Sequence, residues 1–178
     1  MKLSTVKLTT GLLAGAAAGA AGTTALNAVT YLDMAVRGRP SSSTPEQTVD
    51  KLAARSHLRI PGDEETRGNR LGGLGALAGI LAGVGLGAAL GAARAAGWRP
   101  GLLGGSAVAC TGALLVGNGP MTVLGVTDPR SWSATDWVSD LVPHLAYGAV
   151  TAGVLHRLTS GNAASSKTLL FPVSASSR

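Results

Sequence analysis

Four long stretches of the chain are almost free of charged residues and consist largely of alanine, glycine, leucine and valine. A helix needs about 20 residues to cross the hydrocarbon core of a bilayer. The four stretches reach that length, at residues 8–36, 71–96, 102–126 and 137–158. No charged side chain lies between Arg70 and Arg94, or between Arg99 and Asp128. We therefore expect an all-α fold, an integral membrane bundle of four transmembrane helices.

The first stretch also has a second interpretation. Lys2 and Lys7 precede an Ala/Gly-rich run with small residues at 16–18, an arrangement typical of a cleavable signal peptide. However, the apolar character continues to Val36, past the length of a usual signal sequence, and is then closed by Arg37. We favour a retained first span, with cleavage as the alternative.

Residues 38–70 form a polar connector between the first two spans. Thr44 is expected to be the N-cap of a short helix, with Pro45 at the first helical position and Gln47 completing a capping box. A helix that ends near Ser56 would carry apolar side chains on one face and charged ones on the other. The pattern predicts an amphipathic helix along the membrane surface or, equally, a solvated loop helix.

The remaining segments between the spans indicate how the helices are arranged and where the domain ends. Residues 97–101 allow only a tight hairpin, so the second and third spans should be neighbours. The Asn-Gly-Pro run at 118–120 favours an end or a kink of the third helix near Asn118. Residues 1–159 then form one four-helix transmembrane domain. Residues 160–178, rich in serine and alanine, are expected to be a flexible tail.

Composition and charge narrow the class of protein. Charged residues make up 13% of the chain, compared with about 25% in soluble domains. The net charge is +6, but the basic residues lie between the apolar stretches, as in membrane-flanking loops and not as in a nucleic-acid patch. Cys110 is the single cysteine, which excludes an intrachain disulfide. Because no phosphate-binding loop, nucleophile elbow or zinc motif occurs, we expect no cofactor, and the lipid bilayer is the expected partner.

Glycine recurs every four residues in the second span, and the same spacing occurs at residues 11, 15 and 19 of the first. The glycines of the second span are Gly75, Gly79, Gly83, Gly87 and Gly91. In lipid the hydrophobic effect does not draw helices together, so close contact between small residues supplies dispersion energy instead. The pattern predicts close helix packing. We favour packing within one bundle, although the motif equally suits a homo-oligomer or another membrane protein as partner.

Polar side chains inside membrane spans are costly, and each is therefore a candidate functional residue. In the first span, Asn27 and Tyr31 share a face, and Asp33 can pair with Arg37 one turn later. We interpret the Asp33 pair as interfacial. Asn27 lies deeper and is expected to form a hydrogen bond across helices.

The fourth span carries a polar stripe of Asp136, Asp140 and His144 at four-residue steps, followed by Tyr147. Two carboxylates and an imidazole could bind a divalent metal or relay protons. In the interpretation that we favour, a hydroxyl residue such as Ser133 caps the helix and the carboxylates suit its N-terminal dipole. His144 would then form a hydrogen bond with a neighbouring helix.

Several short motifs carry a family resemblance. They are TALNAVTYLDM at 24–34, Arg39-Pro40, STPE at 43–46 and PHLAYG at 143–148. With these motifs the chain resembles uncharacterised multispanning membrane proteins of actinobacteria and, more distantly, YagU-like inner-membrane proteins. The resemblance covers most of residues 11–158. It implies a multispanning membrane protein and brings no catalytic residues.

These observations together predict a non-enzymatic plasma-membrane protein. Its inward polar residues would form one small intramembrane cluster of Asn27, Tyr31, Asp140, His144 and Tyr147. One alternative is a transporter or channel component that moves protons or small ions. Another is a metal-dependent membrane enzyme that uses Asp140 and His144. Lysines ahead of the first span favour cytoplasmic termini, although the basic residues of the two sides are nearly balanced.

Overall fold

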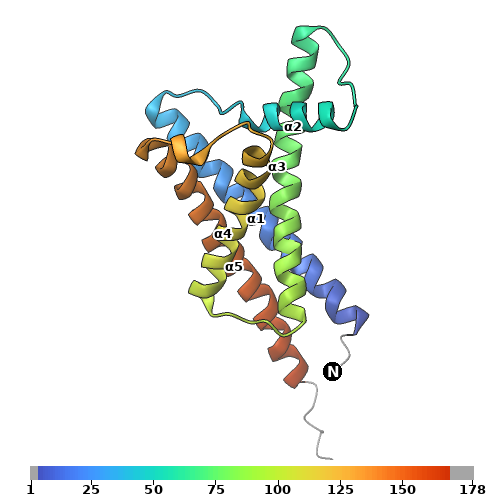
Figure 1. Ribbon diagram of the computed structural model, residues 1–178. Helices are drawn as coiled ribbons and strands as arrows, with labels where there is room; N and C mark the ends of the chain where they lie inside the picture. The colour runs from blue at the N-terminus through green and yellow to red at the C-terminus, as the bar shows by residue number, and fades with distance from the viewer. Residues whose placement is uncertain (1–3, 169–178) are drawn as a thin grey trace, which may run out of the picture.

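The structure is a computed structural model that describes residues 4–168, with side chains as far as Ser160. Over that range the protein consists of helices and connecting loops (Figure 1). The elements are α1 (Thr5–Arg37), α2 (Thr44–Arg55), α3 (Glu64–Ala95), α4 (Leu102–Val123), the 3-10 turn η1 (Pro129–Ser131) and α5 (Ala134–Thr168). Four helices are long and apolar enough to cross a membrane: α1, α3, α4 and α5 as far as Ser160. The predicted all-α fold with four membrane spans is confirmed.

Capping residues determine where the helices begin and end. Ser4 caps α1 and accepts a hydrogen bond from a backbone N–H of the first turn at 3.3 Å. α1 ends before Gly38, whose φ of 61° lies in the left-handed region that glycine adopts without strain. Asp63 caps α3 by accepting from the Thr66 N–H at 2.8 Å. Because of this cap, α3 begins at Glu64, well before the predicted apolar span.

α1 is the central helix of the bundle. It packs most extensively on α3 and α5, whereas α4 packs mainly on α5 and less on α3. In Figure 1, α1 passes diagonally behind α3 and α5, and α4 lies in front. The start of α1, the end of α5 and the α3–α4 turn lie at one end of the bundle, and α2 and η1 lie at the other. α2 therefore lies at one end of the bundle.

α1 and α3 meet backbone to backbone through glycines. They are Gly11, Gly15 and Gly19 of α1, which face Gly91, Gly87 and Gly83 of α3 in antiparallel order. A methyl group added at Gly11 would lie 2.7 Å from the Gly91 carbonyl oxygen, and one at Gly19 would lie 2.5 Å from that of Gly83. No side chain fits at such distances. Small residues therefore allow the two backbones to touch.

The glycine pattern of α3 is not used along its whole length. Gly75 lies against α2, where an added methyl group would be 3.1 Å from the Cβ of Pro45. Gly79 has open space beside it, so the favoured prediction that it packs within the bundle is wrong, and packing against a second chain stays a prediction. The reason is the crossing of α1, which leaves α3 beyond Gly83 and continues toward α5 (Figure 1).

The N-cap of α2 differs from the prediction by one residue. Ser43 is the N-cap, and Thr44 already belongs to the helix. The first turn closes through a hydrogen bond from the Gln47 N–H to the Ser43 carbonyl at 3.0 Å. The Gln47 side chain also donates to the Ser43 hydroxyl at 2.8 Å. The predicted capping box is therefore not formed, because the Ser43 side chain caps no backbone N–H and Gln47 bonds the Ser43 hydroxyl instead of its N–H.

α4 continues through the Asn-Gly-Pro run and ends at Val123, so the run near Asn118 does not end the helix. Pro120 removes only the hydrogen bond that its own N–H would have donated. The following turn still forms, because the Leu124 N–H donates to the Pro120 carbonyl at 2.9 Å. The Thr122 hydroxyl donates to the Asn118 carbonyl at 2.8 Å in the same turn.

α5 extends to Thr168, past the predicted end at residue 158, so the predicted tail 160–178 begins as helix. No proline occurs between Pro143 and Pro172, and the backbone can therefore continue its hydrogen-bonded turns beyond the apolar part. Residues 169–178, the rest of the predicted tail, lie outside the described residues.

Candidate functional site

A polar cluster joins α4 to α5 inside the membrane-spanning part, and we call it the Asp140 cluster. It consists of Asn118, Asp140 and His144. The Asn118 side-chain amide donates to Asp140 Oδ2 at 2.8 Å. His144 Nδ1 lies 3.6 Å from Asp140 Oδ1 and 2.7 Å from the Asp140 backbone carbonyl. The side chains of His144 and Asp140 are only 14% and 19% exposed, so the cluster is largely enclosed by the helices.

The hydrogen bonds of the cluster define its chemistry. A carbonyl oxygen can only accept, so the Nδ1 of His144 carries the proton and donates it to the Asp140 carbonyl. The other ring nitrogen, Nε2, points toward α4 and would lie 3.6 Å from a methyl group at Gly117. The prediction that His144 bonds a neighbouring helix is wrong, since its bond stays within α5. Asp140 makes the interhelical bond instead, through Asn118.

Asn118 is a site residue that the sequence analysis treated only as a helix breaker. A signal for its role was present, because a polar amide inside a long uncharged stretch is costly unless it is paired. The adjacent glycine and Pro120 gave a second, local reason for an asparagine at this point. The helix continues, and the amide is therefore available to the carboxylate on α5.

Tyr147 lies apart from the Asp140 cluster, where α1, α3 and α5 meet, and it shares a hydrophobic cluster with Ala109 and Ala113 of α4. Its hydroxyl donates to the Gly83 carbonyl of α3 at 2.7 Å, and the side chain is 1% exposed. Gly22 of α1 faces both Tyr147 and Thr151, and an added methyl group there would lie 2.9 Å from the tyrosine ring. We call Gly22, Gly83, Tyr147 and Thr151 the Tyr147 junction. The Thr151 hydroxyl is buried there and has no hydrogen-bond partner among the described residues.

Helix geometry explains why the polar stripe of α5 is divided. Four-residue steps from Asp140 to His144 and then to Gly148 keep to the face that contacts α4. Tyr147 follows His144 by only three residues. Its side chain is therefore rotated by about 60° around the helix axis, in the direction opposite to the four-residue steps. Tyr147 therefore faces α1 and α3.

The polar residues of α1 do not join the predicted cluster. Tyr31 is 62% exposed and lies on the outer surface of the bundle. Asn27 is half-buried, and its side chain forms no hydrogen bond within residues 4–168. The five residues predicted to form one cluster are therefore distributed over separate places. α1 packs on α3 and α5, whereas the Asp140 cluster lies between α4 and α5.

Asp33 forms the predicted ion pair with Arg37, at 3.3 Å, and a second one with Arg39 at 2.5 Å. Arg37 also donates to the Ser139 hydroxyl of α5 at 2.6 Å. The group thus connects the end of α1 to the start of α5. The predicted Asp33–Arg37 ion pair is formed, and its position at the membrane interface stays a prediction.

Asp136 belongs to the start of α5. Its backbone N–H donates to the Ser133 hydroxyl at 3.2 Å, and its carboxylate accepts from the Ser133 N–H at 2.9 Å. This reciprocal pair is a capping box. The predicted cap by Ser133 is confirmed, and Asp136, predicted to suit the N-terminal dipole, completes the cap and takes no part in the Asp140 cluster.

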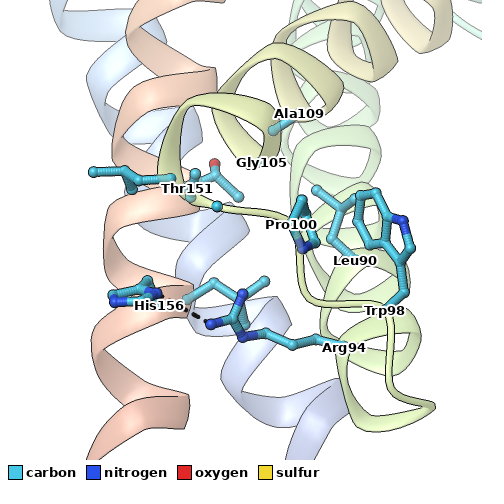
Figure 2. A pocket seen from close by; sticks show the side chains of 12 residues that line it. Leu90, Arg94, Trp98, Pro100, Gly105, Ala109, Thr151 and His156 are labelled. Carbon is cyan, nitrogen blue, oxygen red and sulfur yellow. Dashed lines mark hydrogen bonds between the residues drawn. The ribbon is translucent and has the colours of Figure 1, made fainter.

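A second polar group connects α3 and α5 at the opposite end of the bundle. Arg94 reaches from α3 toward α5, as Figure 2 shows, and donates to the Thr159 hydroxyl at 2.7 Å and to His156 Nδ1 at 3.1 Å. The cavity beside it, next to Trp98, holds about 20 Å³. That volume suits about one water molecule, so we regard the Arg94 group as a helix connection.

The loops outside the spans hold carboxylates with shifted pKa values. Hydrogen bonds from Thr66, from its side chain first and then its backbone, keep the pKa of Asp63 below its ordinary value. The Arg130 side chain lowers the pKa of Asp128 in the same way, and the carboxylate in turn raises the pKa of Arg130. These carboxylates therefore stay ionised at neutral pH and act as helix or turn caps.

Within residues 4–168 no three histidine, cysteine, aspartate or glutamate side chains come together in a way that could hold a metal ion. Asp140 and His144 are therefore left without the further ligand that a protein metal site needs. The alternative of a metal-dependent membrane enzyme receives no support from this geometry.

No protein-family model, curated protein or solved structure matches the chain. The resemblance to actinobacterial membrane proteins thus stays a prediction.

Proposed function

We propose that the protein is a non-enzymatic, multi-pass plasma-membrane protein whose transmembrane helices form a scaffold for the surface helix α2. The observation that carries the proposal is that buried polar side chains form hydrogen bonds between neighbouring helices. Asp140 bonds Asn118 across α4 and α5, and Tyr147 bonds Gly83 across α5 and α3. Groups that could have performed chemistry serve to hold helices together.

The attachment of α2 supports the same proposal. Lys51 donates to the backbone carbonyls of Leu124 and Gly125, just after α4, at 3.2 and 2.8 Å. Asp50 forms an ion pair with Arg67 of α3. α2 is thus tied to two spans, and the bundle presents it in one orientation at the membrane surface.

Ion flux in proteoliposomes tests the scaffold function. The purified chain is reconstituted, and proton and potassium flux are measured beside empty liposomes and the His144→Ala variant. The scaffold proposal expects all three preparations to leak at the same rate. Flux that only the wild-type chain supports would overturn it.

That outcome would favour the second candidate, a transporter or channel component for protons or small ions. The Asp140–His144 pair supports this candidate, because ionisable side chains enclosed between membrane helices commonly mark ion or proton paths. A matched control is Asn27→Ala, a polar position in α1 outside the cluster. Proton conduction through the cluster requires loss of flux in His144→Ala and normal flux in Asn27→Ala.

Cytoplasmic termini are part of the proposal and have their own test. The lysines before α1 support this orientation, since the first span usually dominates. Reporter fusions after residue 60 and after residue 178 should then report opposite sides of the membrane, with the latter inside. Any homo-oligomer would use surfaces other than the α1–α3 glycines, because these already contact each other within one chain.

A further inference from the structure

A groove lies at the α2 end of the bundle, between α2, the loop at 58–61 and the first apolar turns of α3. The groove is open to the outside and offers a space of about 760 Å³. Leu52, Leu58, Leu74 and Leu77 line it, and all four side chains are exposed. Within residues 4–168 nothing covers this apolar surface, and such surfaces mark contact with lipid or a partner.

The charges at the groove are of one sign. Its ionisable lining residues are Arg59 and Arg70, and no carboxylate is among the lining side chains. Arg70 donates one N–H to the Pro61 carbonyl at 2.5 Å, which holds the guanidinium at the groove. An arginine has five N–H donors, so others remain for a ligand. The neighbouring Asp50 is already paired with Arg67. The groove therefore suits an anion attached to an apolar body.

The arginines and leucines of the groove lie at different depths in the membrane, which correspond to the headgroup and the acyl chains of a phospholipid. Arg70 is the last charged residue before the uncharged stretch of α3, so it lies at the membrane boundary. Leu77 lies about 10 Å further along the helix axis, at the level of the hydrocarbon chains. A phosphate at Arg70 would thus place an acyl chain beside Leu74 and Leu77.

We propose that this groove binds an anionic phospholipid of the surrounding leaflet, with its phosphate at Arg59 and Arg70 and an acyl chain against Leu74 and Leu77. This inference goes beyond the scaffold function and does not depend on it. The lipid is the occupant that we favour because the membrane itself supplies a molecule with this division into anionic and apolar parts.

Lipid retention tests the proposal. The full chain is purified from nanodiscs that contain phosphatidylcholine and phosphatidylglycerol, and bound lipids are counted by native mass spectrometry. Wild-type protein should retain phosphatidylglycerol in preference to phosphatidylcholine. The Arg59→Gln and Arg70→Gln variants should each lower this retention about fivefold. Arg130→Gln is the control, because Arg130 is exposed, paired with Asp128 and outside the groove lining.

A second measurement does not depend on the arginine variants folding. Leu77→Trp places a fluorophore in the groove, and Leu81→Trp places one a turn deeper on the exposed surface of α3. Phosphatidylglycerol with brominated acyl chains should quench the tryptophan at position 77 more than brominated phosphatidylcholine does, with no difference at position 81. Equal quenching by the two lipids at position 77, or normal retention in the arginine variants, overturns the proposal. So does crosslinking of position 77 to a second copy of the chain.

Discussion

At the scale of single residues, Gly15 and Gly87 illustrate how little space separates α1 from α3. A methyl group at Gly15 would lie 2.9 Å from the Cα of Gly91, and one at Gly87 would lie 2.7 Å from the Gly19 N–H nitrogen. Neither of these atoms can move away by a side-chain rotation, because both belong to the backbone. The Gly15→Ala variant should therefore lose about 1–3 kcal/mol of unfolding free energy, the usual cost of overpacking.

Gly79→Ala is the matched control for Gly15→Ala, since Gly79 belongs to the same four-residue pattern and has open space beside it. Its unfolding free energy should stay at or slightly above the wild-type value, because alanine favours helix over glycine. Thermal unfolding in detergent measures both variants. Equal losses in the two would contradict the assignment of the α1–α3 contact to Gly15.

The Tyr147 hydroxyl offers a second test at the residue scale. Tyr147→Phe keeps the buried ring and removes the hydrogen bond to the Gly83 carbonyl. Interhelical hydrogen bonds in membranes contribute about 0.6 kcal/mol on average, so a loss of that order is expected. Tyr31→Phe removes an exposed hydroxyl from α1 and should leave stability unchanged. Unfolding followed by circular dichroism separates the two variants, and a larger loss for Tyr31→Phe would count against the junction.

At the scale of elements, the start of α3 depends on one carboxylate. Hydrogen bonds from Thr66 lower the pKa of Asp63, so the ionised form stabilises the folded helix end. This contribution is complete above the unfolded pKa of about 4 and is lost as the pH falls through the lower folded pKa. Amide protection of the first turn of α3 should accordingly fall in acid. Asp63→Asn, which still caps but does not titrate, should remove this pH dependence in hydrogen exchange.

Features within one helix could be predicted from the sequence, whereas contacts between helices could not. The four spans follow from local composition, because an uncharged stretch of about 20 residues has few other stable environments. The Asp33–Arg37 pair was predictable for a similar reason, since both residues lie on one helix. The Asn118–Asp140 bond depends instead on which helices adjoin and how each is rotated, and the sequence pattern does not contain that information. The open space beside Gly79 was not predictable either, because the pattern does not reveal where α1 leaves α3.

At the scale of the whole molecule, α4 is the helix with the weakest attachment. α1, α3 and α5 share the Tyr147 hydrogen bond and the glycine contacts, whereas α4 adds Ala109 and Ala113 to the cluster around Tyr147 and packs widely only on α5. Near the α2 end, its contact with α5 includes the Asn118–Asp140 hydrogen bond. We expect α4 to open more readily than the other spans, since regions with fewer contacts unfold locally at lower cost.

Asn118→Ala should enlarge this difference. The substitution leaves the Asp140 carboxylate without its partner on α4, and an enclosed carboxylate without a hydrogen bond is costly, so α4 should separate from α5 more often. Hydrogen exchange in nanodiscs should show faster exchange across the second half of α4 and unchanged exchange in α1. Asn27→Ala removes a half-buried amide that has no such bond and should change neither helix. Faster exchange in α1 to the same extent as in α4 would mean that the four spans open as one unit, and the division into a core of α1, α3 and α5 with an attached α4 would be wrong.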